Sequence, residues 1–355
     1  MLQRGNMVDN HRQGYWSRAG TWILWSGLVL CLGLSLSRIA SVALVNAAVR
    51  AAVGLPQPTF DLALLEQAIV LEPGNRRANY YAGLQHYNEG QYASSITELE
   101  RTLQDEAGAG PLTALWLGLA YDAAGRKERA IAVWADAKVY ERVMERAQLN
   151  FTLGYWQRAL ADYRLALHIN PDSMVAWLGS GLCLQQLGQH QEAIKVLGEA
   201  LRIDPYSLLV HQAMAGSYVA LGDMASAAAW DERAAKVAPP GEAPLYRGRA
   251  AIWRDDFPTA IAELSAYTQG HPDSVYAFEL LCHTYPRVND ITSAIAACRR
   301  YITLRPTPSA WYYIFLGNLY RSVGELEEAR QAYSTALQLE PGSPDAQENL
   351  RQIAP

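Results

Sequence analysis

Proline recurs along the second half of the chain at intervals of 33 to 35 residues, and an alanine lies twelve residues before each one. The prolines are Pro171, Pro205, Pro239, Pro272, Pro306 and Pro341. The alanines are Ala159, Ala193, Ala227, Ala260, Ala294 and Ala329. Two residue types that repeat in step at this period predict an array of helix-turn-helix units, which can absorb the 355 residues as one solenoid.

Residues 76–342 divide into eight such units, with position one near residues 76, 111, 140, 174, 208, 241, 275 and 310. Position eight of each unit carries a small residue: Gly83, Gly118, Ala147, Gly181, Ala215, Gly248, Cys282 and Gly317. Small residues also fill position twenty, where the alanines of the ladder lie. Because antiparallel helices cross closely only where side chains are small, these two positions predict the crossing points of each helix pair.

Larger apolar residues occupy position twenty-four of most units: Leu99, Trp134, Tyr163, Leu197, Leu264 and Tyr333. Glycine follows the first helix of most units, at Gly90, Gly125, Gly154, Gly188, Gly222 and Gly324. A helix C-terminus favours a residue in the left-handed conformation, which glycine adopts without steric cost. Each glycine therefore predicts the turn between the two helices of its unit.

The last unit resembles the tetratricopeptide repeat (TPR) signature through Leu316, Gly317, Tyr320, Gly324, Ala329, Tyr333, Ala336 and Pro341. The unit at 174–207 resembles it through Trp177, Gly181, Gly188, Ala193, Ala200 and Pro205. The resemblance covers about residues 76–342. It implies an all-α fold, an α-solenoid of TPR helix-turn-helix repeats, and it does not specify one function.

Three places depart from the regular units. Only 29 residues separate the starts at 111 and 140, and no Gly or Pro lies between Arg126 and Leu153, so we expect either two shortened helices or one continuous helix there. Pro73 and Ala68 keep the register of the ladder, so Asp61–Leu71 is expected to be the second helix of a partial unit whose first helix is Val42–Val53. Residues 343–355 are expected to form a capping helix.

The N-terminal region contains an uncharged run of 19 residues, from Ala19 to Ser37. This length suits a transmembrane helix, which we place at 19–41 as a signal anchor. Residues 1–18 then form a basic cytoplasmic tail and 42–75 a stalk and partial repeat, with the repeats on the extracytoplasmic side of a single-pass protein. The alternative is a secretory signal peptide, cleaved near Ser41-Val42-Ala43, which would leave a secreted protein.

The resemblance also implies a binding surface, because the first helices of stacked repeats line a concave groove. The residues that the TPR pattern directs into this groove, and that we expect to contact a protein or peptide, are Tyr80, Tyr87, Leu115, Leu119, Leu178, Leu182, Arg249, Trp253, Tyr276, His283 and Trp311. Large amphipathic rings such as those of Trp253, Tyr276 and Trp311 often dominate binding energy at protein interfaces.

The chain shows no pattern typical of catalysis or metal binding. Its seven histidines are scattered, and no HExxH, GxSxG or phosphate-binding loop occurs. Residues 1–55 carry a net charge of +4, from five arginines and one aspartate, so the total of −5 leaves −9 on the rest. An acidic array without a basic stripe argues against a nucleic-acid partner.

The four cysteines lack metal-ligand spacing. Cys282 and Cys298 fall on the two helices of one unit, where we expect buried free thiols; a disulfide is the alternative in an oxidising compartment.

From these features we expect a membrane-anchored TPR scaffold that binds a partner protein or peptide in its groove. It is not expected to be an enzyme, and neither a cofactor nor a small-molecule substrate is expected. The alternative function is an accessory subunit that docks an envelope enzyme or a secretion or glycan-processing complex.

Overall fold

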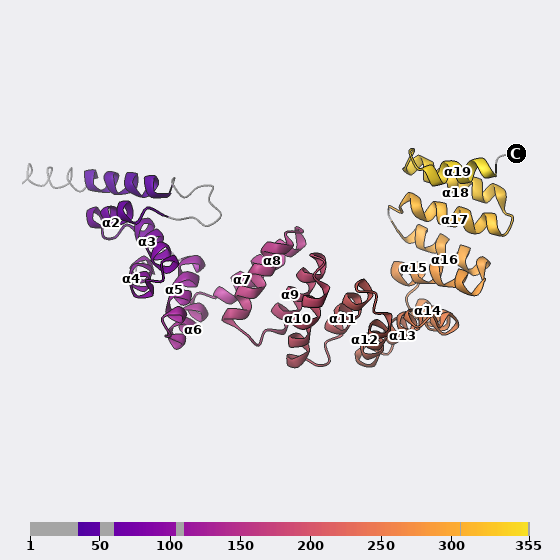
Figure 1. The fold of residues 1–355 in the computed structure, drawn as a ribbon, viewed down its shortest axis with the longest axis horizontal. Coiled ribbons are helices and arrows are strands. Elements are labelled where there is room, and N and C mark those ends of the chain that lie inside the picture. Colours follow the sequence, from indigo (N-terminus) through magenta and orange to yellow (C-terminus); the bar gives the residue numbers. More distant parts are fainter. Residues whose placement is uncertain (1–34, 50–59, 104–109, 306, 354–355) are drawn as a thin grey trace, which may run out of the picture. The chain divides into compact units, whose positions relative to one another are not determined.

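The computed structural model describes residues 35–49, 60–103, 110–305 and 307–353. These residues form helices joined by short turns, and no strand occurs among them (Figure 1). The chain divides into two compact units, residues 1–143 and 144–355, and the division falls inside α7 (Val139–Thr152). Each unit is built from successive helix pairs, and the fold is an all-α, TPR-like solenoid.

The first helices of the eight pairs begin within two residues of the starts predicted by the ladder. They are α3 (Arg76–Asn88), α5 (Pro111–Ala123), α7 (Val139–Thr152), α9 (Met174–Gln186), α11 (Leu208–Ala220), α13 (Ala243–Trp253), α15 (Val275–Thr284) and α17 (Ala310–Ser322). A short 3-10 helix, η1 (Tyr285–Val288), extends α15.

The second helices follow after the predicted turns. They are α4 (Tyr92–Leu103), α6 (Lys127–Asp136), α8 (Trp156–Ile169), α10 (His190–Ile203), α12 (Met224–Val237), α14 (Phe257–Gly270), α16 (Ile291–Leu304) and α18 (Leu326–Leu339). Beyond the last pair, α19 (Pro344–Gln352) lies where a capping helix is expected and buries Ala346.

The residues at position eight are small because the two helices of each pair cross closely there, as the sequence indicated. A Cβ atom added to Gly181 would lie 2.5 Å from Leu197 Cδ2, and one added to Gly317 would lie 2.5 Å from Tyr333 Cε1. These distances are far below van der Waals contact. The large residue at position twenty-four therefore occupies the space that a side chain at position eight would need.

All six predicted turn glycines adopt positive φ, between 73° and 82°. Two units without such a glycine use Asp255, with φ of 58°, and Asn289, with φ of 60°, at the same step of the repeat. Aspartate and asparagine tolerate the left-handed region better than other side chains. The turn therefore keeps its geometry through all these units although its residue changes.

The irregular segment between residues 126 and 153 contains two helices. Helix α6 has only 10 residues, whereas α7 has 14, and the turn between them, Ala137–Lys138, places Lys138 at φ of 49°. The continuous-helix alternative was thus wrong, and of the two helices only the first is shortened. The other units are joined by turns of at least four residues, such as Asn170–Ser173, so the missing residues come from α6 and from this turn.

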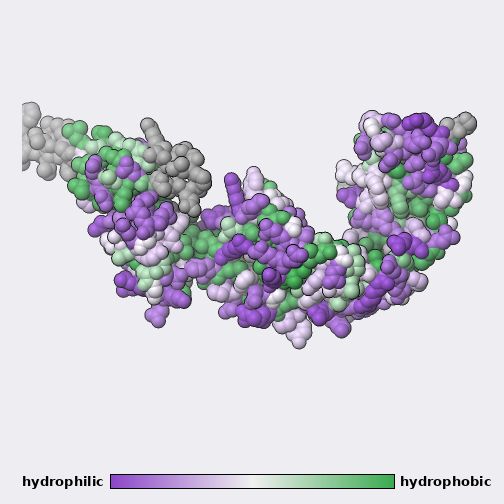
Figure 2. All heavy atoms as spheres, in the orientation of Figure 1, coloured by the Kyte–Doolittle hydropathy of each residue, from purple (hydrophilic) through white to green (hydrophobic). Residues whose placement is uncertain are grey.

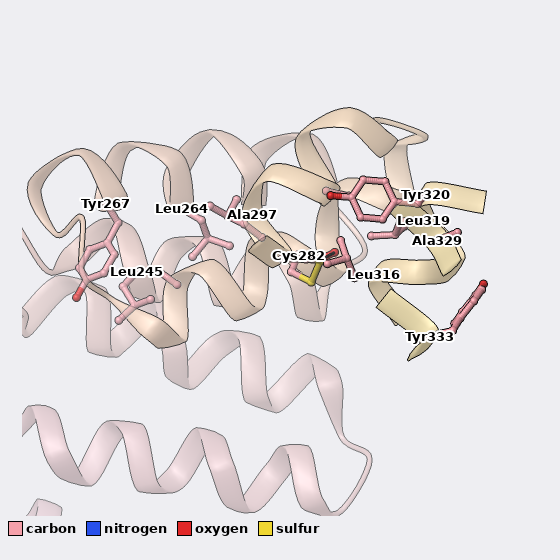
Figure 3. Packing of buried hydrophobic residues seen from close by; sticks show 14 of the residues in the cluster. Leu245, Leu264, Tyr267, Cys282, Ala297, Leu316, Leu319, Tyr320, Ala329 and Tyr333 are labelled. Carbon is pink, nitrogen blue, oxygen red and sulfur yellow. Dashed lines mark hydrogen bonds between the residues drawn. A yellow bond between two sulfur atoms is a disulfide. The ribbon is translucent and has the colours of Figure 1, made fainter. Parts of the chain in front are cut away.

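The expectation of free thiols at Cys282 and Cys298 was wrong, because the two residues form a disulfide (Figure 3). They occupy positions eight and twenty-four of one unit, and their Cα atoms lie 4.8 Å apart. At this helix crossing the covalent bond takes the place of the glycine and large apolar residue found in other units. Both cysteines are fully buried within a core that includes Leu281, Leu316 and Tyr320.

The described part of the chain begins with helical residues 35–49, which pack against α2 (Leu62–Leu71). Ser41 Oγ donates a hydrogen bond to the Ala68 carbonyl at 3.0 Å, and Val45 and Leu65 are buried between the helices. These residues therefore belong to the first packed helix pair rather than to a free stalk. Residues 50–53 of the expected helix lie outside the described residues.

The expected membrane-spanning segment, 19–41, lies outside the described residues as far as residue 34. Within the described ranges, no helix is both long enough and apolar enough to cross a membrane.

Candidate partner-binding surface

The predicted groove residues on α3 and α5 differ in their exposure. Tyr80 and Tyr87 on α3 are half-buried, and the Tyr87 ring lies 5.4 Å from that of Trp116 on α5. Burial raises the pKa of both tyrosines above the ordinary value, so their hydroxyls stay protonated near neutral pH. Leu119 is half-buried, but Leu115 is only 5% exposed and belongs to the core.

The two predicted leucines of α9 also pack inward. Leu178 is 8% exposed and belongs to a buried cluster with Leu197, Val210 and Met214, against which Leu182 packs. Position five of the repeat therefore serves packing between helices here, as it does at Leu115. The expectation that Leu115 and Leu178 line a ligand surface is corrected accordingly.

In the C-terminal repeats, by contrast, the predicted aromatic residues reach solvent. Trp311 on α17 is 51% exposed and Tyr276 on α15 is 43% exposed. Trp311 stacks on Phe315, with ring centroids 5.2 Å apart and planes within 8°. His283 on α15 lies 5.4 Å from Trp311 and 5.0 Å from Phe315. Two neighbouring first helices thus share one aromatic cluster.

The surroundings of His283 favour its neutral form. Burial lowers the pKa of His283 below its ordinary value of 6.5, and the Glu279 carboxylate opposes this shift. Glu279 itself accepts a hydrogen bond from the Tyr312 hydroxyl. At neutral pH the imidazole is therefore an uncharged ring that contributes stacking area to the cluster.

A buried carboxylate holds the other predicted residues. Asp231 on α12 is fully buried, and its Oδ1 lies 3.2 Å from Arg249 Nη2 while its Oδ2 accepts a 2.7 Å hydrogen bond from Trp253 Nε1. The guanidinium carbon of Arg249 in turn lies 5.9 Å from the centre of the Tyr276 ring. Asp231 therefore orients two side chains of α13, and Arg249 links them to α15.

The electrostatics of Asp231 reflect its burial. Desolvation raises the pKa of its carboxyl above the ordinary value of 3.8, and Arg249 and the Trp253 indole N–H act in the opposite direction. A buried charge of this kind is tolerated only where paired. The ion pair with Arg249 is thus part of what allows the carboxylate to occupy a core position.

Helices α13, α15 and α17 together present the C-terminal aromatic surface, defined by Arg249, Trp253, Tyr276, His283, Trp311 and Phe315. Sequence reasoning missed Phe315 and Asp231. Phe315 follows Trp311 by four residues, a spacing that puts both on one helix face. Asp231 stands at position twenty-four, where the units on either side have Leu197 and Leu264. A carboxylate at a position that is apolar in the neighbouring units could have been noticed in the sequence.

A hollow lies between α16, α17 and α18 in the last two repeats. It has a volume of about 380 Å³ and is lined by residues of these helices, including Ile302, Tyr313, Leu316 and Thr335. Arg299 and Glu328 are also among the residues that line it. This hollow offers a competing place for a partner and supplies a control surface for experiments.

The described ranges hold no cluster of three or more His, Cys, Asp or Glu side chains that could bind a metal ion. The described residues form successive helix pairs, and the C-terminal pairs display aromatic rings. The class of protein that this fold defines is a repeat scaffold, and TPR folds are typical of protein–protein interaction.

Comparisons with known proteins find TPR repeats in two parts of the chain. Residues 144–207 match the family model described as tetratricopeptide repeat, and residues 317–350 match the model described as TPR repeat. The TPR repeat-containing thioredoxin TTL4 of Arabidopsis thaliana is 28% identical over 103 residues, which are 29% of this chain and 15% of that protein. This chain thus matches only a small part of that relative.

Solved structures share the fold at low sequence identity. PilW, described as a widely conserved type IV pilus biogenesis factor, is 20% identical with a TM-score of 0.54, covering 60% of this chain and 98% of PilW. PilF of Pseudomonas aeruginosa is 14% identical with a TM-score of 0.51, covering 60% and 97%. At these identities the likeness establishes the architecture and nothing about partners.

Proposed function

We propose that this chain is a membrane-anchored TPR scaffold that binds a partner protein or peptide on its C-terminal aromatic surface. The observation that carries the proposal is the exposure of Trp311 and Tyr276 on adjacent first helices. Trp311 contacts Phe315 and His283, and Tyr276 lies next to Arg249. Exposed aromatic rings held on rigid elements bury much area at small entropic cost, and such residues are enriched among interface hot spots.

The surface suits a polypeptide better than a small molecule. Its residues spread over three helices, α13, α15 and α17, and its exposed rings are those of Tyr276 and Trp311. Such a spread matches an extended or helical segment with several anchors. TPR proteins are generally non-catalytic scaffolds, and the proposal accordingly assigns no reaction to this surface.

The proposed location is the membrane, with the repeats on the extracytoplasmic side. The uncharged run from Ala19 to Ser37 supports an anchor. The Cys282–Cys298 disulfide supports the side, because structural disulfides persist in oxidising compartments and are rare in the cytosol. Docking of an envelope enzyme or complex is the second form of the proposal, since it uses the same surface with a larger partner.

The proposal is tested with the full chain by replacing Trp311 with alanine and measuring recovery of co-purified proteins after crosslinking in cells. Trp311→Ala removes an exposed anchor, so recovery of a specific partner should fall by about tenfold or more. The matched control is Tyr206→Ala, which removes a ring that is 78% exposed in the turn between α10 and α11. Equal recovery from both variants would refute the proposed surface.

A further inference from the structure

Exposed apolar side chains gather at one end of the first helix pair. Leu36, Ile39 and Val42 are 65%, 66% and 48% exposed on helical residues 35–49, and Val70 and Leu71 are 80% and 41% exposed on α2. Single exposed apolar residues are ordinary on soluble proteins, but a group of large ones marks a surface that meets something apolar.

Two contacts show that these residues come from the same end of the pair. Arg38 Nε lies 3.6 Å from Glu72 Oε1, and Ser41 Oγ donates to the Ala68 carbonyl at 3.0 Å. The beginning of helical residues 35–49 therefore lies beside the end of α2. Figure 2 shows apolar surface over this helix pair, at the place that Figure 1 gives to residues 35–49 and α2.

The sequence outside the described residues indicates what covers this end. The uncharged run that ends at Ser37 leads directly into this end of the first helix pair. Arg38 is the first charged residue after that run. The side chain of Arg38 pairs with Glu72 at 3.6 Å and is 75% exposed, so most of it is accessible to lipid headgroups. Apolar groups followed at once by a cation are the pattern of a bilayer interface.

We infer that this end of the first helix pair is seated in the interfacial region of the lipid bilayer, with Val70 and Leu71 among the acyl chains near the headgroups. The inference rests on the proposed membrane anchor and adds that no spacer separates the bilayer from the repeats. It also assigns a lipid contact to α2, about 30 residues beyond the anchor in sequence. A second copy of the chain would be the competing occupant.

The test places an environment-sensitive fluorophore at Val70→Cys in the full chain, reconstituted into vesicles of phosphatidylcholine and phosphatidylglycerol. Cys31→Ala removes one competing thiol, and Cys183 is fully buried with its pKa raised to about 11, so it does not react. The matched control is Ala63→Cys, which is exposed near the other end of α2, about 10 Å away.

Lipids brominated near the headgroup should quench the probe at position 70 by about half and leave that at position 63 unchanged. If the chain floats with the vesicles but neither probe is quenched, the inference is overturned while the anchor stands. A fluorescence change at position 70 that follows protein concentration without bromolipid quenching also overturns it, in favour of a second copy. If the chain does not float with vesicles, the proposed anchor and the inference fail together.

Discussion

At the scale of single residues, Asp231 is the side chain whose chemistry is least expected at its position. It is fully buried at the step of the repeat where neighbouring units place leucine, and its charge is met by Arg249 and the Trp253 indole. A well-packed apolar residue would serve stability as well. What the aspartate adds is a fixed orientation for two side chains of the C-terminal aromatic surface.

Replacing Asp231 by alanine should lower the free energy of unfolding of the C-terminal repeats by about 3–5 kcal/mol, because Arg249 would keep its buried charge without a partner. Urea denaturation combined with hydrogen exchange in α12 and α13 measures this loss. The paired change Asp231→Leu with Arg249→Met removes both charges and should cost much less. Equal losses in the two variants would show that the ion pair is not the source of the effect.

Asp231 also predicts a pH dependence of unusual sign for a carboxylate. Its folded-state pKa is raised above the ordinary value of 3.8, so the folded state holds the proton more tightly than the unfolded chain. Its contribution to stability therefore falls as pH rises from 3.8 through the raised pKa, and is largest below that window. The stability of the wild type relative to Asp231→Asn should increase on acidification through this window; a decrease would contradict the shift.

At the scale of helices, the crossing of each pair depends on a small residue facing a large one. Gly181→Ala would bring a Cβ to 2.5 Å from Leu197 Cδ2, whereas a Cβ at Gly198, on the partner helix α10, meets nothing within 4 Å. We expect Gly181→Ala to destabilise by about 1–3 kcal/mol. Gly198→Ala should stabilise by about 0.5–1 kcal/mol, since alanine is the better helix former.

Thermal unfolding of the two alanine variants beside the wild type measures both effects. Because the two expected changes in stability have opposite signs, a uniform effect of replacing glycine by alanine in a helix cannot explain both. A stabilising Gly181→Ala would mean that α9 and α10 do not cross at this residue.

The disulfide between α15 and α16 gives a second prediction at this scale. Its sequence separation is 16 residues, for which loss of the crosslink should lower stability by about 3 kcal/mol. A reductant should therefore lower the urea midpoint of the wild type but not that of a Cys282→Ser, Cys298→Ser variant. Titration of thiols in the denatured, unreduced chain should find two, those of Cys31 and Cys183; four would contradict the disulfide.

Most helices could be predicted from the sequence because one spacing fixes them all. The starts of α3, α9 and α17 coincide with position one of the ladder. The period could not show that Asp255 and Asn289 make the glycine's turn, because their left-handed conformation depends on the chain around them. Nor could it separate Leu178, which packs between helices, from Trp311, which reaches solvent. Whether such a residue is buried depends on the side chains of the neighbouring repeats, and its position within its own unit does not specify those side chains.

At the scale of the whole chain, a repeat array distributes its stability among local contacts. The two compact units therefore need no common core, and each contains first helices of helix pairs. If the N-terminal helix pair meets the bilayer and the C-terminal repeats meet the partner, the two ends of the array have separate roles. The anchor would then confine the binding surface near the membrane and raise its local concentration there.

The central claim, that a partner binds the C-terminal aromatic surface, is tested most directly by photocrosslinking in intact cells from single positions. A photoreactive phenylalanine analogue at position 311 should give a discrete crosslinked product that is lost in the Tyr276→Ala background. The same analogue at Thr335, which lines the hollow on α16 to α18, should not give that product. A product formed from position 335 and not from position 311 would contradict the claim.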